Sequence, residues 1–151
     1  MRRRIGSRGA LSRSPCGGCS ELGLLTRRSN EEASTDRVAL SSLSGEKIVS
    51  VLQSGPIGDL IRREMTRLDV GFDESISART FYVAAALVRA GVRVALVDNF
   101  TAQVVAVPDL LFRTIKPAIS FDVFAIWLES RPPTVQLQGF LDIVAELVSN
   151  S

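Results

Sequence analysis

Polar side chains that could hold a small charged molecule follow three strands expected in this sequence. The expected strands cover residues 47–52, 72–78 and 92–97. The polar residues after them are Ser54, Thr80, Asp98 and Asn99. Hydroxyl groups and the free N–H groups at helix starts bind carboxylates or phosphates, and a carboxylate binds an amino group. The pattern indicates a binding site, although Ser54 and Thr80 could only cap helices and Asp98 could only begin a turn.

Several kinds of catalytic chemistry have no basis in this sequence. The chain has no histidine, so serine–histidine and cysteine–histidine nucleophiles are excluded. Cys16 and Cys19 are its only cysteines, whereas a structural zinc ion needs four ligands. A thioredoxin-type dithiol would sit at a strand–helix junction and not in a glycine-rich segment. With no glycine-rich nucleotide loop or carboxylate pair, we expect no enzyme activity, no metal and no cofactor.

The central structural signal lies in Thr80–Asp98. Small and apolar residues over 81–88 predict a helix that lies against a sheet, and Thr80 is placed to cap its start. Gly91 suits the left-handed position that ends a helix. The apolar run at 92–97 then predicts a strand covered on both faces.

A second helix is predicted over residues 56–68. Pro56 suits the first helical position, and the apolar residues recur at helical spacing. Strands and helices that alternate in this order favour an α/β fold with a parallel sheet. In such sheets ligands bind at the carboxyl ends of the strands, so the polar residues above should meet at one edge.

The ends of the chain differ in composition from its middle. Residues 1–28 hold seven arginines and one acid, which leaves 11 of the 18 basic and 15 of the 16 acidic residues for the rest, a net charge of −4. Because residues 1–35 lack any helical or strand period, we expect a disordered arginine-rich extension there; an organelle transit peptide has a similar composition. Strands are expected over 110–115 and 121–128, and a last helix after Thr134. No apolar run is long enough to span a membrane.

The segment Asp36–Val148 resembles the C-terminal part of the effector-binding (substrate-binding) domain of LysR-type transcriptional regulators. The resemblance runs through VALSSLSGEKIVSV, SGPIGDLIRREM, ALVRAGVRVALVDNFTA, PAISFDVFAIW and RPPTVQLQGFLDIV. The VDNFTA segment is most similar to the branch that senses diaminopimelate or opine-like amino acids. The resemblance does not reach the first 35 residues.

This resemblance implies a two-lobed, periplasmic-binding-protein-like (type 2) fold with an effector held between the lobes. Residues 43–113 would form most of the second lobe, and residues 117–150 would return to complete the first lobe, which is otherwise incomplete. A winged helix-turn-helix has no counterpart, so we expect a truncated regulator that does not bind DNA itself. The implied effector contacts are Ser54, Gly55, Pro56, Ile57, Thr80, Phe81, Asp98, Asn99 and Phe100.

The function implied is that of a cytoplasmic, effector-sensing fragment whose ligand is an amino acid or a small carboxylate. An alternative is a non-enzymatic interaction module, or a non-functional truncated regulator, that dimerises with a full-length relative through the helix Ile57–Leu68. A homodimer or a heterodimer with a LysR-type regulator is expected, and no membrane partner. The enzyme alternative would require turnover that depends on Asp98.

Overall fold

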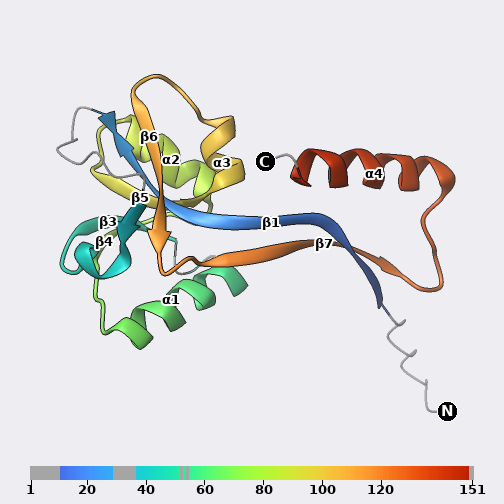
Figure 1. Cartoon of the computed structure of the whole chain (residues 1–151), viewed down its shortest axis with the longest axis horizontal. Coiled ribbons are helices and arrows are strands. Elements are labelled where there is room, and N and C mark those ends of the chain that lie inside the picture. Colours follow the sequence, from blue (N-terminus) through green and yellow to red (C-terminus); the bar gives the residue numbers. More distant parts are fainter. Residues whose placement is uncertain (1–10, 29–36, 52, 54, 150–151) are drawn as a thin grey trace, which may run out of the picture. The chain divides into compact units, whose positions relative to one another are not determined.

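The computed structural model of the protein describes residues 11–28, 37–51, 53 and 55–149. Strands and helices alternate along most of this length (Figure 1). In chain order they are β1 (Leu11–Arg27), β2 (Arg37–Ala39), the 3-10 turn η2 (Leu40–Leu43), β3 (Lys47–Ser50), α1 (Pro56–Leu68), β4 (Asp73–Ser77), α2 (Phe81–Arg89), β5 (Val94–Asp98), α3 (Asn99–Val104), β6 (Leu110–Lys116), β7 (Ser120–Leu128) and α4 (Val135–Ser149). Two compact units share them: unit 1 contains Met1–Cys19 and Asp122–Ser151, and unit 2 contains Ser20–Phe121.

Unit 2 is built on a mixed sheet with the strand order β2-β6-β1-β5-β3-β4. The strands β4, β3 and β5 are parallel, as the alternation of strands and helices predicted. Strand β1 is antiparallel to both of its neighbours, β5 and β6, and β2 is parallel to β6. The α/β fold class was therefore predicted correctly. The sheet as a whole is mixed, because β1 is antiparallel to its neighbours β5 and β6.

The prediction of a disordered extension over residues 1–35 is wrong for residues 11–27, which form β1. Its second half fills the middle of the unit 2 sheet, where Leu22, Leu24 and Leu25 are at most 2% exposed. A strand buried on both faces shows no alternation of polar and apolar residues, so the short LGLL run gave no strand period. Residues 1–10 and 29–36 of the predicted extension lie outside the described residues.

Gly23 explains how β1 fits between its neighbours. It pairs with Val97 of β5 on one side and with Thr114 of β6 on the other. A Cβ atom at Gly23 would meet the Phe112 ring, and it would lie 2.6 Å from the carbonyl oxygen of Arg113. Glycine is therefore required here by close packing of two strands.

The helices of unit 2 follow the sequence pattern closely. On α1, Ile61 and Met65 are buried, and charged residues cover the outer side. On α2, Thr80 caps the start as predicted, and Ala84, Ala85 and Val88 face the core, whereas Ala86 is exposed. Gly91, just after α2, has a φ of 106°, the left-handed conformation that the sequence indicated.

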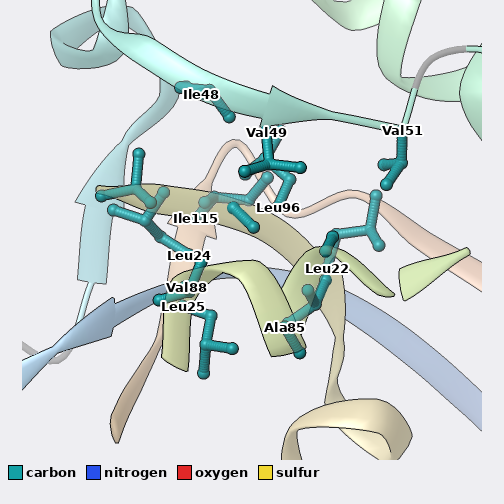
Figure 2. Close-up of a cluster of buried hydrophobic side chains, with 14 of the residues drawn as sticks. Leu22, Leu24, Leu25, Ile48, Val49, Val51, Ala85, Val88, Leu96 and Ile115 are labelled. Atoms are coloured by element: carbon teal, nitrogen blue, oxygen red, sulfur yellow. The ribbon is translucent and has the colours of Figure 1, made fainter. Parts of the chain in front are cut away.

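Unit 2 has a continuous apolar core between its sheet and helices. Figure 2 shows this cluster, to which β1, β3, α2, β5 and β6 all contribute. The labelled side chains are Leu22, Leu24, Leu25, Ile48, Val49, Val51, Ala85, Val88, Leu96 and Ile115. Strand β5 is buried at all five positions, which confirms the prediction of a strand covered on both faces.

Unit 1 contains the first half of β1, most of β7 and helix α4. Strand β7 pairs with β1, and the Arg13 guanidinium lies 5.1 Å from the centre of the Phe124 ring. Thr134 accepts a hydrogen bond from the Leu137 N–H at 3.3 Å, so it caps α4 as predicted. The chain passes from unit 1 to unit 2 within β1, between Cys19 and Ser20, and returns within β7, between Phe121 and Asp122.

The two cysteines are free thiols on β1, with Cys16 buried and Cys19 exposed. Three residues along a strand span about 10 Å, well beyond the roughly 7 Å between Cα atoms that a disulfide allows. Cys16 and Cys19 therefore cannot close a disulfide while β1 is formed.

Candidate functional site

The carboxyl ends of β4, β3 and β5 lie at the same edge of the sheet, called the candidate edge below. Ser50 of β3 is level with Ser77 of β4, and Val49 is level with Ala95 of β5. Neighbouring strands are about 4.8 Å apart, so the three ends fall within roughly 10 Å of one another. Helices α1, α2 and α3 each begin just after one of these strands. The topology thus gathers the starts of three helices at one edge of the sheet.

Helix α1 begins at the candidate edge without a side-chain cap among the described residues. Gly55 has φ 69° and ψ −139°, a backbone conformation that glycine adopts readily and other residues rarely adopt. Pro56 is the first helical residue, as predicted. Ser54, the predicted hydroxyl donor, lies outside the described residues. The N–H groups of this first turn carry the positive end of the helix dipole, which favours an anion. The Ile57 side chain packs against the core of unit 2.

Helix α2 begins with a side-chain cap. The Thr80 hydroxyl oxygen accepts a hydrogen bond from the Val83 N–H at 3.2 Å. The hydroxyl hydrogen can still be donated to a ligand, because a threonine hydroxyl is both donor and acceptor. Phe81 is half-buried and packs against the core.

Helix α3 is capped by Asp98, which is only 6% exposed. One carboxylate oxygen accepts from the Thr101 N–H at 2.8 Å, and the other accepts from the Thr101 hydroxyl at 2.7 Å. Each oxygen keeps a second lone pair, so an amino group could still be bound. Asp98 therefore holds the turn, which was the alternative reading of the sequence. The Phe100 side chain, one residue inside α3, is half-buried.

Asn99 has a structural partner that the sequence did not predict. Its Oδ1 accepts hydrogen bonds from the Ser20 hydroxyl at 2.7 Å and from the Glu21 N–H at 3.2 Å. These contacts attach β1 to the start of α3 at the point where the chain enters unit 2. No local pattern could have indicated them, because the partners are separated by 78 or 79 residues.

A buried hydroxyl at the end of β3 was also missed. Ser50 is buried, and its hydroxyl donates to a carboxylate oxygen of Glu74 on β4 at 3.0 Å. The sequence did contain an indication of this residue, because Ser50 is the polar residue that ends the strand segment KIVS. That position places Ser50 beside the candidate edge.

The described residues at the candidate edge offer hydrogen-bond donors and acceptors, and none of them forms a recognisable catalytic group. Eight of the nine predicted residues start or flank the three helices at the candidate edge, and Ser54 is outside the described part of the chain. Within the described part no three His, Cys, Asp or Glu side chains gather as metal ligands would. No described helix is both long and apolar enough to cross a membrane.

The apolar stripe of α1 is not available to a partner. Ile61 and Met65 are buried, while Ile57, Leu60 and Leu68 pack against the core. On the outer face, Arg62 pairs with Asp59 at 3.2 Å and Arg67 with Glu64 at 2.8 Å. Dimerisation through this helix stays a prediction, and it would have to use this charged face.

Comparison with known proteins identifies the family. Residues 10–149 match the LysR substrate binding domain. Among curated proteins, the chain is 29% identical over 112 residues to the HTH-type transcriptional regulator DgcR of a Pseudoalteromonas species, covering 74% of this chain and 38% of DgcR. Among solved structures, it is similar to HinK, a LysR family regulator from Pseudomonas aeruginosa, with a TM-score of 0.73, 14% identity and coverage of 99% of this chain and 52% of that one. It is also similar to the Synechocystis PCC6803 CcmR regulatory domain, solved with 2-PG, with a TM-score of 0.75, 14% identity and coverage of 97% and 71%.

An open mixed α/β sheet of this kind is the periplasmic-binding-protein-like (type 2) fold of effector-binding domains. The chain belongs to the LysR substrate-binding domain family. That match begins at residue 10, so the resemblance extends well before Asp36, where the sequence alone had placed its start. The family is one of transcriptional regulators and not of enzymes. The chain spans about half, or less, of the length of DgcR and HinK.

Proposed function

We propose that this chain senses a small-molecule effector, an amino acid or a small carboxylate, for a cytoplasmic LysR-type transcriptional regulator. The observation that carries the proposal is the meeting of three helix starts at the candidate edge. Membership of the LysR substrate-binding family supports it. The similar CcmR domain was solved in complex with 2-PG, which shows that this fold holds a small ligand in that protein.

In this proposal the effector carboxylate lies at the uncapped start of α1. The N–H groups after Pro56 and the hydroxyl groups of Thr80 and Ser54 would donate to it. An effector amino group would lie near Asp98, whose carboxylate stands at the start of α3 beside the candidate edge. Asn99 can donate from Nδ2, because its Oδ1 is engaged by β1. Phe81 and Phe100 would supply the apolar sides of the site.

The direct test is a thermal-shift and calorimetry series on the full chain. The probes are diaminopimelate, glutamate, acetate and 2-PG. A ligand present at ten times its Kd stabilises the folded state by about 1.4 kcal/mol. For a unit of this size such a gain raises Tm by roughly 6–11 °C. Flat melting curves and no heat across these probes would contradict effector sensing.

Thr80→Val supplies the site-specific variant, because it keeps the shape and removes the hydroxyl. We expect it to weaken binding by about ten- to a hundredfold, since a hydrogen bond to a charged group contributes about 1.5–3 kcal/mol. Thr134→Val is the matched control: Thr134 also caps a helix through its hydroxyl, but in unit 1. Equal loss of binding in both variants would place the effector elsewhere.

A further inference from the structure

Strand β1 loses one neighbouring strand at the point where the chain enters unit 2. The ladder between β1 and β5 ends with Leu22 level with Asp98, and the next residue, Asn99, already begins α3. Glu21 and Ser20 therefore lie beyond the last pair of this ladder, and Ser20 is the first residue of unit 2. An N–H group in such a position needs an acceptor other than a neighbouring strand, unless water reaches it.

The Asn99 side chain takes the place of the missing strand. Its Oδ1 accepts from the Glu21 N–H at 3.2 Å and from the Ser20 hydroxyl at 2.7 Å. Next along β1, the Leu22 N–H donates to the Ile119 carbonyl at 2.9 Å. The first three residues of β1 in unit 2 are thus held by two separate contacts, and one of them is made by a single side chain.

These contacts determine which way the Asn99 carboxamide faces. A backbone N–H group can only donate, so the amide atom that the Glu21 N–H meets must be the oxygen. The oxygen and nitrogen of a carboxamide lie in one plane, so an engaged Oδ1 also sets the direction of Nδ2. Among the described residues nothing accepts a hydrogen bond from Nδ2. Asn99 therefore offers donor hydrogens on a group that β1 already orients.

Burial holds the carboxamide in this orientation. Ser20 is 0% exposed, and a rotated Asn99 would withdraw its oxygen from the Ser20 hydroxyl and the Glu21 N–H together. Leu22 and Ile119 beside the contact are at most 2% exposed, so water has little access to replace the lost acceptor. Withdrawing an acceptor from buried donors is costly, because hydrogen bonds are strong where the dielectric constant is low.

We propose that Asn99 is a positioning residue that couples effector binding at the candidate edge to β1 where the chain enters unit 2. This inference rests on the proposed function, because it requires an effector oxygen, from a carboxylate or a hydroxyl, that accepts from Nδ2. Such an oxygen holds one end of the planar carboxamide, while Ser20 and Glu21 hold the other end. Each contact removes freedom that the other would have to remove, so effector binding strengthens the attachment of β1, and the attachment strengthens binding.

Amide hydrogen exchange at Glu21 measures this attachment in the full chain without ligand. Asn99→Ala should speed exchange of the Glu21 N–H by about tenfold or more, because its acceptor is removed. Ser20→Ala should speed it by roughly two- to tenfold, the effect of one ordinary hydrogen bond. Ser42→Ala is the matched control, since it removes a hydroxyl that donates to the Ala39 carbonyl elsewhere in unit 2, and it should leave the Glu21 rate unchanged.

The ligand series repeats the measurement with diaminopimelate, glutamate, acetate and 2-PG. A probe that binds should slow Glu21 exchange by about fivefold or more, the lower end of typical coupling between sites. The rate is taken relative to Leu24 in the middle of β1, so that a general gain of stability cancels. In Asn99→Asp the carboxylate can still accept from Ser20 and Glu21, but it has no Nδ2 hydrogen to donate. Glu21 should therefore stay protected in this variant, and a bound probe should no longer slow its exchange.

The variants separate coupling from a purely structural role. If Asn99 only held the fold, a bound probe would slow Glu21 exchange equally in the native chain and in Asn99→Asp, and that result would overturn the proposal. Unchanged Glu21 exchange in Asn99→Ala, or a probe that binds without slowing it, would do the same. Far-UV circular dichroism checks that Asn99→Asp is folded; if it is not, Ser20→Ala replaces it, and there a bound probe should slow exchange less than in the native chain.

Failure of this inference can be told apart from failure of the proposed function. If no probe raises Tm or releases heat, the proposed function fails and the coupling fails with it. If a probe binds but Glu21 exchange does not respond, only the coupling fails. A fivefold slowing that is present in the native chain and lost in Asn99→Asp would establish the role of Asn99.

Discussion

Replacing Gly23 by alanine tests whether β1 lies in the middle of the unit 2 sheet. The new Cβ would overlap the Phe112 ring and would lie 2.6 Å from the Arg113 carbonyl oxygen. The ring can rotate away, but the carbonyl belongs to the strand that is hydrogen-bonded to β1. Overpacking of this kind costs about 1–3 kcal/mol, and a clash with backbone favours the upper part of that range.

We therefore expect Gly23→Ala to lower the free energy of unfolding by about 2–3 kcal/mol. A unit of about 100 residues loses about 4–8 °C of Tm per kcal/mol, so Tm should fall by roughly 10–20 °C. The measurement is urea and thermal unfolding followed by circular dichroism. Adding Phe112→Leu should recover only part of the loss, because the Arg113 carbonyl remains.

Gly71→Ala is the control for this prediction. It makes the same chemical change where a Cβ would meet nothing within 4 Å. We expect its effect to stay within about 0.5 kcal/mol of zero. If Gly23→Ala is as mild as Gly71→Ala, β1 does not lie between β5 and β6, and residues 11–27 would belong to the extension that the sequence indicated over residues 1–35.

Three further substitutions probe other contacts by the same unfolding assay. Asn99→Ala should lower the free energy of unfolding by about 2 kcal/mol, because two hydrogen bonds to β1 are lost. A double-mutant cycle with Ser20→Ala should give a coupling energy near 1 kcal/mol, and purely additive effects would contradict the contact between Asn99 and Ser20. Thr26→Val should stabilise by about 1 kcal/mol, since the buried Thr26 hydroxyl has no hydrogen-bond partner among the described residues, and a loss of stability would contradict this. Gly139→Ala should stabilise α4 by about 0.5–1 kcal/mol, as nothing lies within 4 Å of a Cβ there, and an unchanged unfolding midpoint would argue against a helix at this position.

The sequence predicted the parts of the fold whose patterns are local. The stripe of α1, the Thr80 cap and the Gly91 stop each depend on a few neighbouring residues, and all three are present. Strand β1 was not predicted, because burial on both faces removes the alternation of polar and apolar residues that marks a strand. Its partner strands also lie far along the chain. Gly23, which lies between leucines, marks a place where β1 and β6 approach closely.

The candidate site was predictable to the level of topology. Parallel winding places the starts of α1, α2 and α3 at one edge, and the structure has this arrangement. The hydrogen bonds within the site were not predictable. Asp98 and Asn99 are adjacent in the sequence, yet one caps α3 and the other holds β1. Such roles depend on side-chain directions that a sequence pattern does not encode.

The position of β1 has a consequence for the order of events during synthesis. Leu22–Thr26 pair with residues 94–98 of β5, and β6 closes the other side with residues 110–114. A strand that emerges early from the ribosome must therefore wait until roughly 90 more residues have been translated. Until β5 and then β6 have been translated its leucines lack their strand neighbours, and contacts this distant along the chain form slowly. Nascent chains that stop before β6 should consequently depend on chaperones far more than the finished polypeptide does.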